Sequence, residues 1–226
     1  MPYLVCVEEN EGRWIAHVPD LPGCFVQHAH LEQAIQAVPE AVEVYIAWCE
    51  GHGLRITGLS DPMIVAEVIR TWESEDGYEV NAFFASDRPP LVEDELPQFE
   101  RLLTATRKDL MAVVDGLGAE DLAREFPGER WAIGGVLMHV ARAEWWYLDR
   151  MGLAFSSAEL PDEPFKGLTK VREYLLAKLP ELAKRRGVVT LTGETWSARK
   201  VLRRALWHER DHRDHIEKLR SKLPQW

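Results

Sequence analysis

Cysteine is scarce in this sequence. Only Cys6, Cys24 and Cys49 are present, and no two of them form a CxxC pair. An odd number of cysteines without such spacing argues against a disulfide framework and favours a reducing compartment. Long apolar runs are absent as well, so we expect no transmembrane helix. The first residues lack a basic segment followed by an apolar stretch, so no signal peptide is expected, and together these absences predict a cytoplasmic protein.

Basic residues are scarce in the first part of the chain. Residues 1–92 contain 4 basic and 15 acidic residues, a net charge of −11, and none of the 4 is a lysine. Residues 93–226 contain 23 basic and 22 acidic residues, a net charge of +1. Binding of nucleic acid needs clusters of Lys and Arg, so no nucleic-acid partner is expected. The acidic part either contacts a basic protein partner or only aids solubility.

The pattern of residues changes near position 90. Before it, runs typical of strands surround one helical run at 31–49, in which Pro39 should kink or break the helix. The expected strands are 3–8, 13–18, 24–28, 63–72 and 78–85. This pattern predicts an α+β domain over residues 1–88, followed by a linker at 87–90.

After the linker the pattern is helical. The helices that we expect are 94–116, 131–152, 167–186 and 197–222. Four helices of this length predict an all-α, up-down four-helix bundle over residues 93–226. Residues 188–192 could form a short extended piece before the last helix.

Histidines on two of these helices indicate a metal site. His208 and His212 lie four residues apart, so their imidazoles point the same way from the last helix. His139 is on an earlier helix whose apolar residues indicate that it faces the bundle interior. Three imidazoles can hold a divalent metal ion and leave coordination positions open. The alternative is that these histidines bind nothing and fill a polar bundle centre.

Other polar residues near these histidines are weaker candidates. Arg142 and Arg204 each lie one turn from a histidine and could bind a substrate carboxylate, or could be solvated. Glu144 lies about 140° around the helix from His139, which makes it a poor ligand. Glu209 and Asp211 either orient imidazole N–H groups or lie on the solvated surface, and the surface is favoured.

The helical part resembles the DinB/YfiT-like superfamily of metalloenzymes. The resemblance is carried by Trp131-Ala-Ile-Gly-Gly-Val-Leu-Met-His139 and by Leu206-Trp-His-Glu-Arg-Asp-His-Arg-Asp-His-Ile216. It implies a four-helix bundle in which His139, His208 and His212 hold zinc, nickel or a similar ion. His215 stands where this superfamily commonly has glutamine or another polar residue, which leaves a fourth ligand or an exchange with His212 open. The superfamily includes transferases and isomerases that use low-molecular-weight thiols.

The first part resembles HicB-type antitoxin domains. The resemblance is carried by Val18-Pro-Asp-Leu-Pro-Gly-Cys-Phe25 and by Leu31-Glu-Gln-Ala-Ile-Gln-Ala, and covers about residues 1–52. It implies strands, a sharp turn and a long helix, without the DNA-binding segment that members often add. We expect this module to act as a scaffold, a lid or an oligomerisation surface, whose strand edges could extend a sheet across a homodimer.

These patterns lead to two hypotheses from different classes. The favoured one is a metal-dependent enzyme that acts on a small molecule, through metal-bound hydroxide or through a metal-bound thiolate. The alternative is a binding or regulatory protein, in which the acidic module recognises a basic protein and the bundle performs no reaction.

Overall fold

The computed structural model describes residues 2–56 and 62–224. It confirms the expected fold class, with strands and helices first and a helical bundle after them. The chain forms two compact units, residues 1–90 with 185–203, and residues 91–184 with 204–226. In the described part of the chain, no helix is long and apolar enough to cross a membrane.

The first unit contains a four-stranded sheet in the order β3-β2-β1-β4. The antiparallel strands are β1 (Tyr3–Asn10), β2 (Arg13–His17) and β3 (Phe25–His28), and β4 (Met63–Arg70) pairs in parallel with β1. Glu11 and Gly12 close the first hairpin with φ of 51° and 72°. Two positive φ values suit the tight turn that matches the twist of paired strands.

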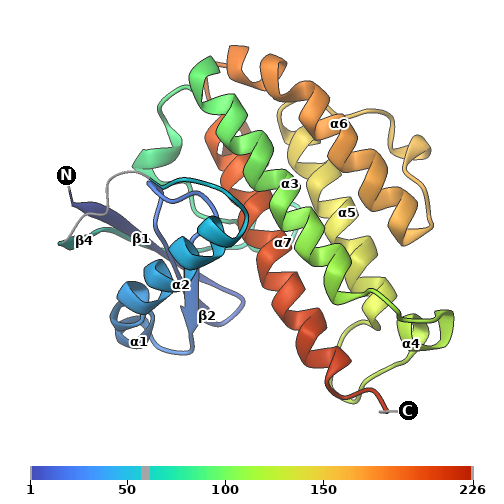
Figure 1. The fold of residues 1–226 in the computed structure, drawn as a ribbon. Helices are drawn as coiled ribbons and strands as arrows, with labels where there is room; N and C mark the ends of the chain where they lie inside the picture. The colour runs from blue at the N-terminus through green and yellow to red at the C-terminus, as the bar shows by residue number, and fades with distance from the viewer. Residues whose placement is uncertain (1, 57–61, 225–226) are drawn as a thin grey trace. The chain divides into compact units, whose positions relative to one another are not determined.

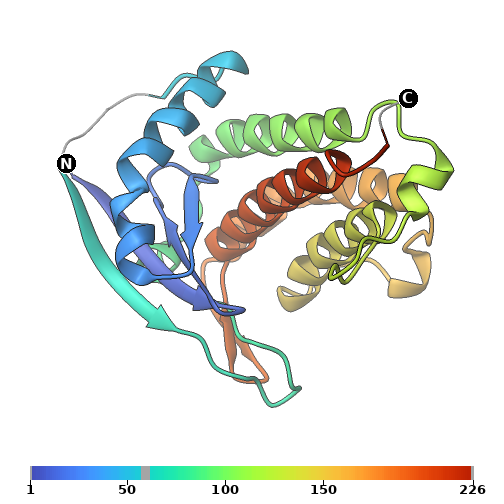
Figure 2. The ribbon, with the colours of Figure 1, turned by 90° about the horizontal axis from the view of Figure 1, so that it is seen from below.

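Two helices of the first unit pack against β2 and β3 (Figure 2). They are α1 (Leu31–Gln36) and α2 (Val38–Gly51), where the sequence predicts one run. Pro39 lies in the first turn of α2, where its missing N–H costs no hydrogen bond, and Ala37 separates the two helices. The break predicted at this proline is therefore confirmed.

Residues 78–85 do not form the strand that their alternation predicts. Their burial does alternate, with Val80 and Ala82 fully buried. Pairing among the described residues of this segment is nevertheless limited to an isolated bridge between Glu73 and Glu79. The predicted strand is therefore wrong, and β4 ends at Arg70 with a loop after it.

Charged side chains supply the hydrogen-bond partners that a neighbouring strand would otherwise give to the backbone of this segment. The Ala82 N–H donates to Glu8 Oε2 at 2.8 Å, the Asn81 carbonyl accepts from Lys200 Nζ at 2.8 Å, and the Ala82 carbonyl accepts from Arg203 Nη2 at 2.8 Å. Buried backbone groups need such partners wherever they come from. The segment is thus held in an extended form without being part of a sheet.

A second, small sheet belongs to the same unit. It is a hairpin of β5 (Val189–Leu191) and β6 (Glu194–Trp196), closed by Thr192 and Gly193 with φ of 48° and 81°. This hairpin confirms the extended piece expected at 188–192 and adds a strand that the sequence pattern did not indicate.

Buried ion pairs hold residues 185–203 in the first unit. Lys200 Nζ, which donates to the Asn81 carbonyl, is paired within the segment with Glu194 Oε1 at 2.7 Å, and both side chains are fully buried. Arg203 makes a bidentate pair with Asp87, at 3.0 Å and 2.8 Å, and its Nη1 lies 3.6 Å from Glu8 Oε1. The start of the last helix therefore supplies the cations that the first unit's buried carboxylates need.

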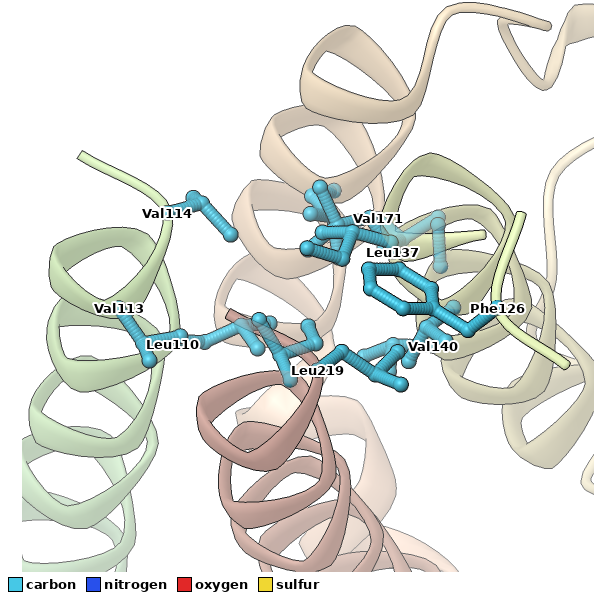
Figure 3. Packing of buried hydrophobic residues seen from close by; sticks show 13 residues of the cluster. Leu110, Val113, Val114, Phe126, Leu137, Val140, Val171 and Leu219 are labelled. Atoms are coloured by element: carbon cyan, nitrogen blue, oxygen red, sulfur yellow. The ribbon is translucent and has the colours of Figure 1, made fainter. Parts of the chain in front are cut away.

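The second unit is the helical bundle, and it has the four long helices that were expected. Its helices are α3 (Leu96–Val113), the short α4 (Ala119–Ala123), α5 (Ile133–Arg150), α6 (Pro164–Lys184) and the later turns of α7 (Ala198–Arg220) (Figure 1). Short 3-10 turns occur at Ala85–Asp87, Glu93–Glu95 and Ser157–Glu159. Apolar residues from every long helix meet in one core, shown in Figure 3 by Leu110, Val113, Leu137, Val140, Val171 and Leu219.

Candidate metal centre

Three histidines converge inside the bundle. His208 and His212 come from α7, and His139 comes from α5. His208 Nε2 lies 3.0 Å from His139 Nε2 and 3.1 Å from His212 Nε2. Their ligand atoms all lie within 4.8 Å of one another, and among the described residues they make up the one group of this kind. His208 is buried, while the other two are half-buried.

The spacing of these nitrogens fits a cation better than it fits hydrogen bonds. An imidazole nitrogen offers one proton or one lone pair in the ring plane, so His208 Nε2 cannot bond well to two other ring nitrogens. Ligands at about 2.1 Å from a metal ion stand about 3.0–3.4 Å apart when the angle between them is 90–109°. The two measured distances match that range, so the donor set suits a divalent ion bound by imidazole.

The protonation of these rings also suits a metal ligand. Burial, helped by the Arg130 guanidinium, lowers the pKa of His139 to about 4. Burial, followed by His212 and His139, lowers the pKa of His208 well below its ordinary value. Both imidazoles are therefore neutral at neutral pH, which is the form that coordinates metal ions.

Aromatic rings surround the three histidines. Trp131 stacks on His139 with ring centroids 4.5 Å apart and planes at 25°, and Tyr147 meets the His208 ring edge-on at 6.1 Å. Trp131 can lie there because residue 135 is glycine, since a Cβ at Gly135 would stand 3.0 Å from Trp131 Cβ. Such rings restrict water around the imidazoles and hold His139 in one orientation.

His215 is not brought into the group. Its Nε2 lies 2.9 Å from Glu129 Oε2, and its ring centroid is 6.0 Å from that of His212. Hydrogen bonds from His215 and Lys222 lower the pKa of Glu129. The structure therefore gives His215 a carboxylate partner at the edge of the site rather than a place among the converging nitrogens.

The two arginines considered from the sequence differ in their surroundings. Arg142 is exposed. Arg204 is buried, and its guanidinium carbon lies 4.0 Å from the Trp207 ring centre and 6.0 Å from that of Tyr147. A third arginine, Arg130, was missed by the sequence reasoning, although its place directly before the tryptophan of the motif could have drawn attention to it.

A buried network of charges fixes α7 on the side away from the histidines. Arg172 Nη2 lies 2.8 Å from both Glu144 Oε2 and Glu209 Oε2, and Arg107 Nη2 lies 2.9 Å from Glu144 Oε2. Arg107 also pairs with Glu209. The expectation that Glu209 lies on the solvated surface is wrong, because this side chain is 1% exposed. Glu209 of this network directly follows His208 along α7, so the network helps to set the direction of the imidazole.

Comparisons with known proteins agree with both parts of the chain. A family model described as the DinB superfamily matches residues 102–216, and one described as HicB_like antitoxin of bacterial toxin-antitoxin system matches residues 3–77. A UPF0150 protein of Archaeoglobus fulgidus is 36% identical over 47 residues, which are 20% of this chain and 68% of that protein. A UPF0150 protein of Thermoplasma acidophilum is 35% identical over 57 residues, which are 25% of this chain and 83% of that protein. No solved structure matches the chain significantly.

The two matches cover successive parts of the sequence, and the DinB match includes residues 185–203, which belong to the first unit of the fold. DinB domains are generally metal-binding helical domains, and the matched residues include all three converging histidines. The chain therefore belongs to the DinB superfamily, through the bundle that holds the three histidines, and carries a HicB-like antitoxin module before it in the sequence.

Proposed function

We propose that this protein binds one divalent metal ion, zinc or nickel, through His139, His208 and His212, and acts with it on a small molecule. The reaction is either hydrolysis or transfer that depends on a low-molecular-weight thiol. The observation that supports this is the convergence of three imidazole nitrogens from two helices, 3.0 and 3.1 Å apart. A site of three protein ligands leaves positions open, as catalytic sites need.

The chain's own residues set the conditions for that chemistry. When bound, a divalent ion would supply either a water of lowered pKa or a place to hold a thiolate. Neutral imidazoles leave the charge of such an ion undiminished. Trp131 and Tyr147 limit the access of bulk water, and Arg204 adds a buried positive charge beside His208. These conditions favour anionic over neutral ligands.

Elemental analysis of tag-free protein tests the metal site. The wild-type chain should hold about one equivalent of metal, and His208→Ala should lose it, because two half-buried imidazoles bind divalent ions weakly. His215→Ala is the matched control and should keep its metal, since His215 pairs with Glu129. If the wild type takes up no metal even after reconstitution, the histidines only fill the bundle centre. If His215→Ala loses its metal and His208→Ala keeps it, then His215 is a metal ligand in place of His208.

A second candidate function is recognition of a basic protein by the first unit. It is favoured by the match to an antitoxin model and by the net charge of −11 over residues 1–92. A pull-down with the full chain should then retain a specific basic protein that is released as salt rises, because charge attraction is screened. Recovery of only non-specific basic proteins, at every salt concentration, would contradict this role.

A further inference from the structure

Arg130 is joined to the three-histidine group by a stack of flat groups. Its guanidinium carbon lies 4.5 Å from the centre of the Trp131 ring. Trp131 in turn stacks on His139, with ring centroids 4.5 Å apart. A guanidinium that rests on an aromatic face is held by the π-electrons and keeps its N–H donors for other partners. The stack therefore holds a cation at the edge of the site, one indole ring beyond His139.

The charge of Arg130 is not neutralised by the protein. Over residues 2–56 and 62–224, no hydrogen bond or ion pair is recorded for its guanidinium, and the side chain is exposed. Its neighbour Glu129 already accepts hydrogen bonds from His215 and Lys222, at 2.9 Å and 3.1 Å. By contrast, Arg107 and Arg172 in the same unit are both paired with buried carboxylates. Arg130 is thus an oriented cation with free donors, separated from His139 by the Trp131 ring.

We propose that Arg130 is the anion-binding residue of this site, and that it selects small molecules whose carboxylate lies several bonds away from the atom that binds the metal ion, because the Trp131 ring separates Arg130 from His139. This proposal rests on the proposed function, because the metal ion would hold the other end of the molecule. A guanidinium and a carboxylate form a bidentate pair of charge-assisted hydrogen bonds. A phosphate carries more negative charge than one guanidinium balances, and Lys222 is already held by Glu129. A mercapto acid or hydroxy acid with a chain of several carbons between its two polar ends fits these requirements.

The test compares two thiols on cobalt-loaded, full-length protein. The probes are 6-mercaptohexanoate, which has a carboxylate, and 6-mercaptohexanol, which has none, and the absorbance of the cobalt–thiolate bond reports binding. Wild-type protein should bind the carboxylate thiol about ten-fold more tightly than the neutral one. Arg130→Gln should bind both thiols equally. Arg130→Lys should keep part of the preference, because lysine keeps the positive charge but lacks the paired N–H donors of the guanidinium. Arg124→Gln is the matched control, an exposed arginine that should leave the preference unchanged.

The outcomes separate this proposal from the one on which it rests. Equal binding of the two thiols by wild-type protein, or an undiminished preference in Arg130→Gln, would overturn the role of Arg130. The thiolate absorbance in either case would still support the metal site. A chain that takes up no cobalt, or shows no thiolate absorbance with either probe, would overturn both. Tighter binding of 6-mercaptohexyl phosphate than of 6-mercaptohexanoate would replace the carboxylate with a phosphate and overturn the assigned substrate class.

Discussion

A fragment of residues 1–92 is expected not to fold, although it contains all the residues that match the HicB-like model. Glu8 and Asp87 are buried in the first unit, and their cation, Arg203, comes from the start of α7. The fragment also loses Lys200, which donates to the Asn81 carbonyl. Removing the partner of a buried charge costs about 3–5 kcal/mol, against a typical total stability of about 5–15 kcal/mol. Circular dichroism and the spread of amide NMR signals, compared with the full chain, measure the result.

Point variants of the full chain separate this effect from truncation itself. Arg203→Ala should lower the midpoint of denaturant unfolding of the first unit, because Asp87 loses both of its bonds to the guanidinium. Arg70→Ala removes an exposed pair with Glu9 and should cost less than about 1 kcal/mol. A fragment 1–92 with dispersed, native-like NMR signals would show that its carboxylates tolerate the loss of these cations.

The second large effect is expected from Arg172→Ala in the bundle. Arg172 pairs with Glu144 and Glu209, and the substitution leaves both carboxylates with Arg107 as the remaining cation of the network. Breaking a buried network in this way should reduce the free energy of unfolding by about 3–5 kcal/mol. Urea denaturation followed by tryptophan fluorescence is the measurement. Arg213→Ala, which removes a partly exposed pair with Glu217, is the control and should cost less than about 1 kcal/mol.

The same network predicts how the bundle responds to acid. Burial alone would raise the pKa of Glu209, but Arg107 and Arg172 outweigh burial and lower it. A carboxyl whose pKa is lower in the folded state stabilises the fold above its unfolded pKa, and this contribution disappears as pH falls through the folded pKa. The stability difference between wild type and Arg172→Ala should therefore shrink below about pH 4. Equal stability of the two proteins at pH 7 would show that the network contributes nothing.

The site could be predicted because it depends on local spacing. His208 and His212 share a face of any helix, and His139 lies on the apolar face of another, so convergence requires only that two helices pack. The helices of the bundle followed from their apolar period in the same way. The break at Pro39 followed from its missing N–H, which belongs to the residue itself.

What could not be predicted depends on partners distant in the sequence. Residues 78–85 alternate as a strand does, but the groups that satisfy the carbonyls of Asn81 and Ala82 are Lys200 and Arg203, more than a hundred residues later. From the sequence alone, Glu209 resembles a solvent-exposed acid on a charged helix. In the structure it pairs with Arg107 and Arg172, which come from two other helices. Periodicity reports which face a residue lies on, and carries no information about which charge will meet it there.

During synthesis, residues 1–90 cannot complete their fold until residues 185–203 have been made. Domains usually fold in order from the N-terminus as they leave the ribosome, at roughly 5–20 residues per second. Here the first unit needs the β5–β6 hairpin and Arg203, so it stays incomplete while the helices between them are being made. The residues that form the sheet, including Ile64 and Val68 of β4, then remain unfolded for roughly 5–20 s, until the buried cations have been made. Chaperones that bind exposed strand-forming segments would therefore encounter this nascent chain before its first unit has folded.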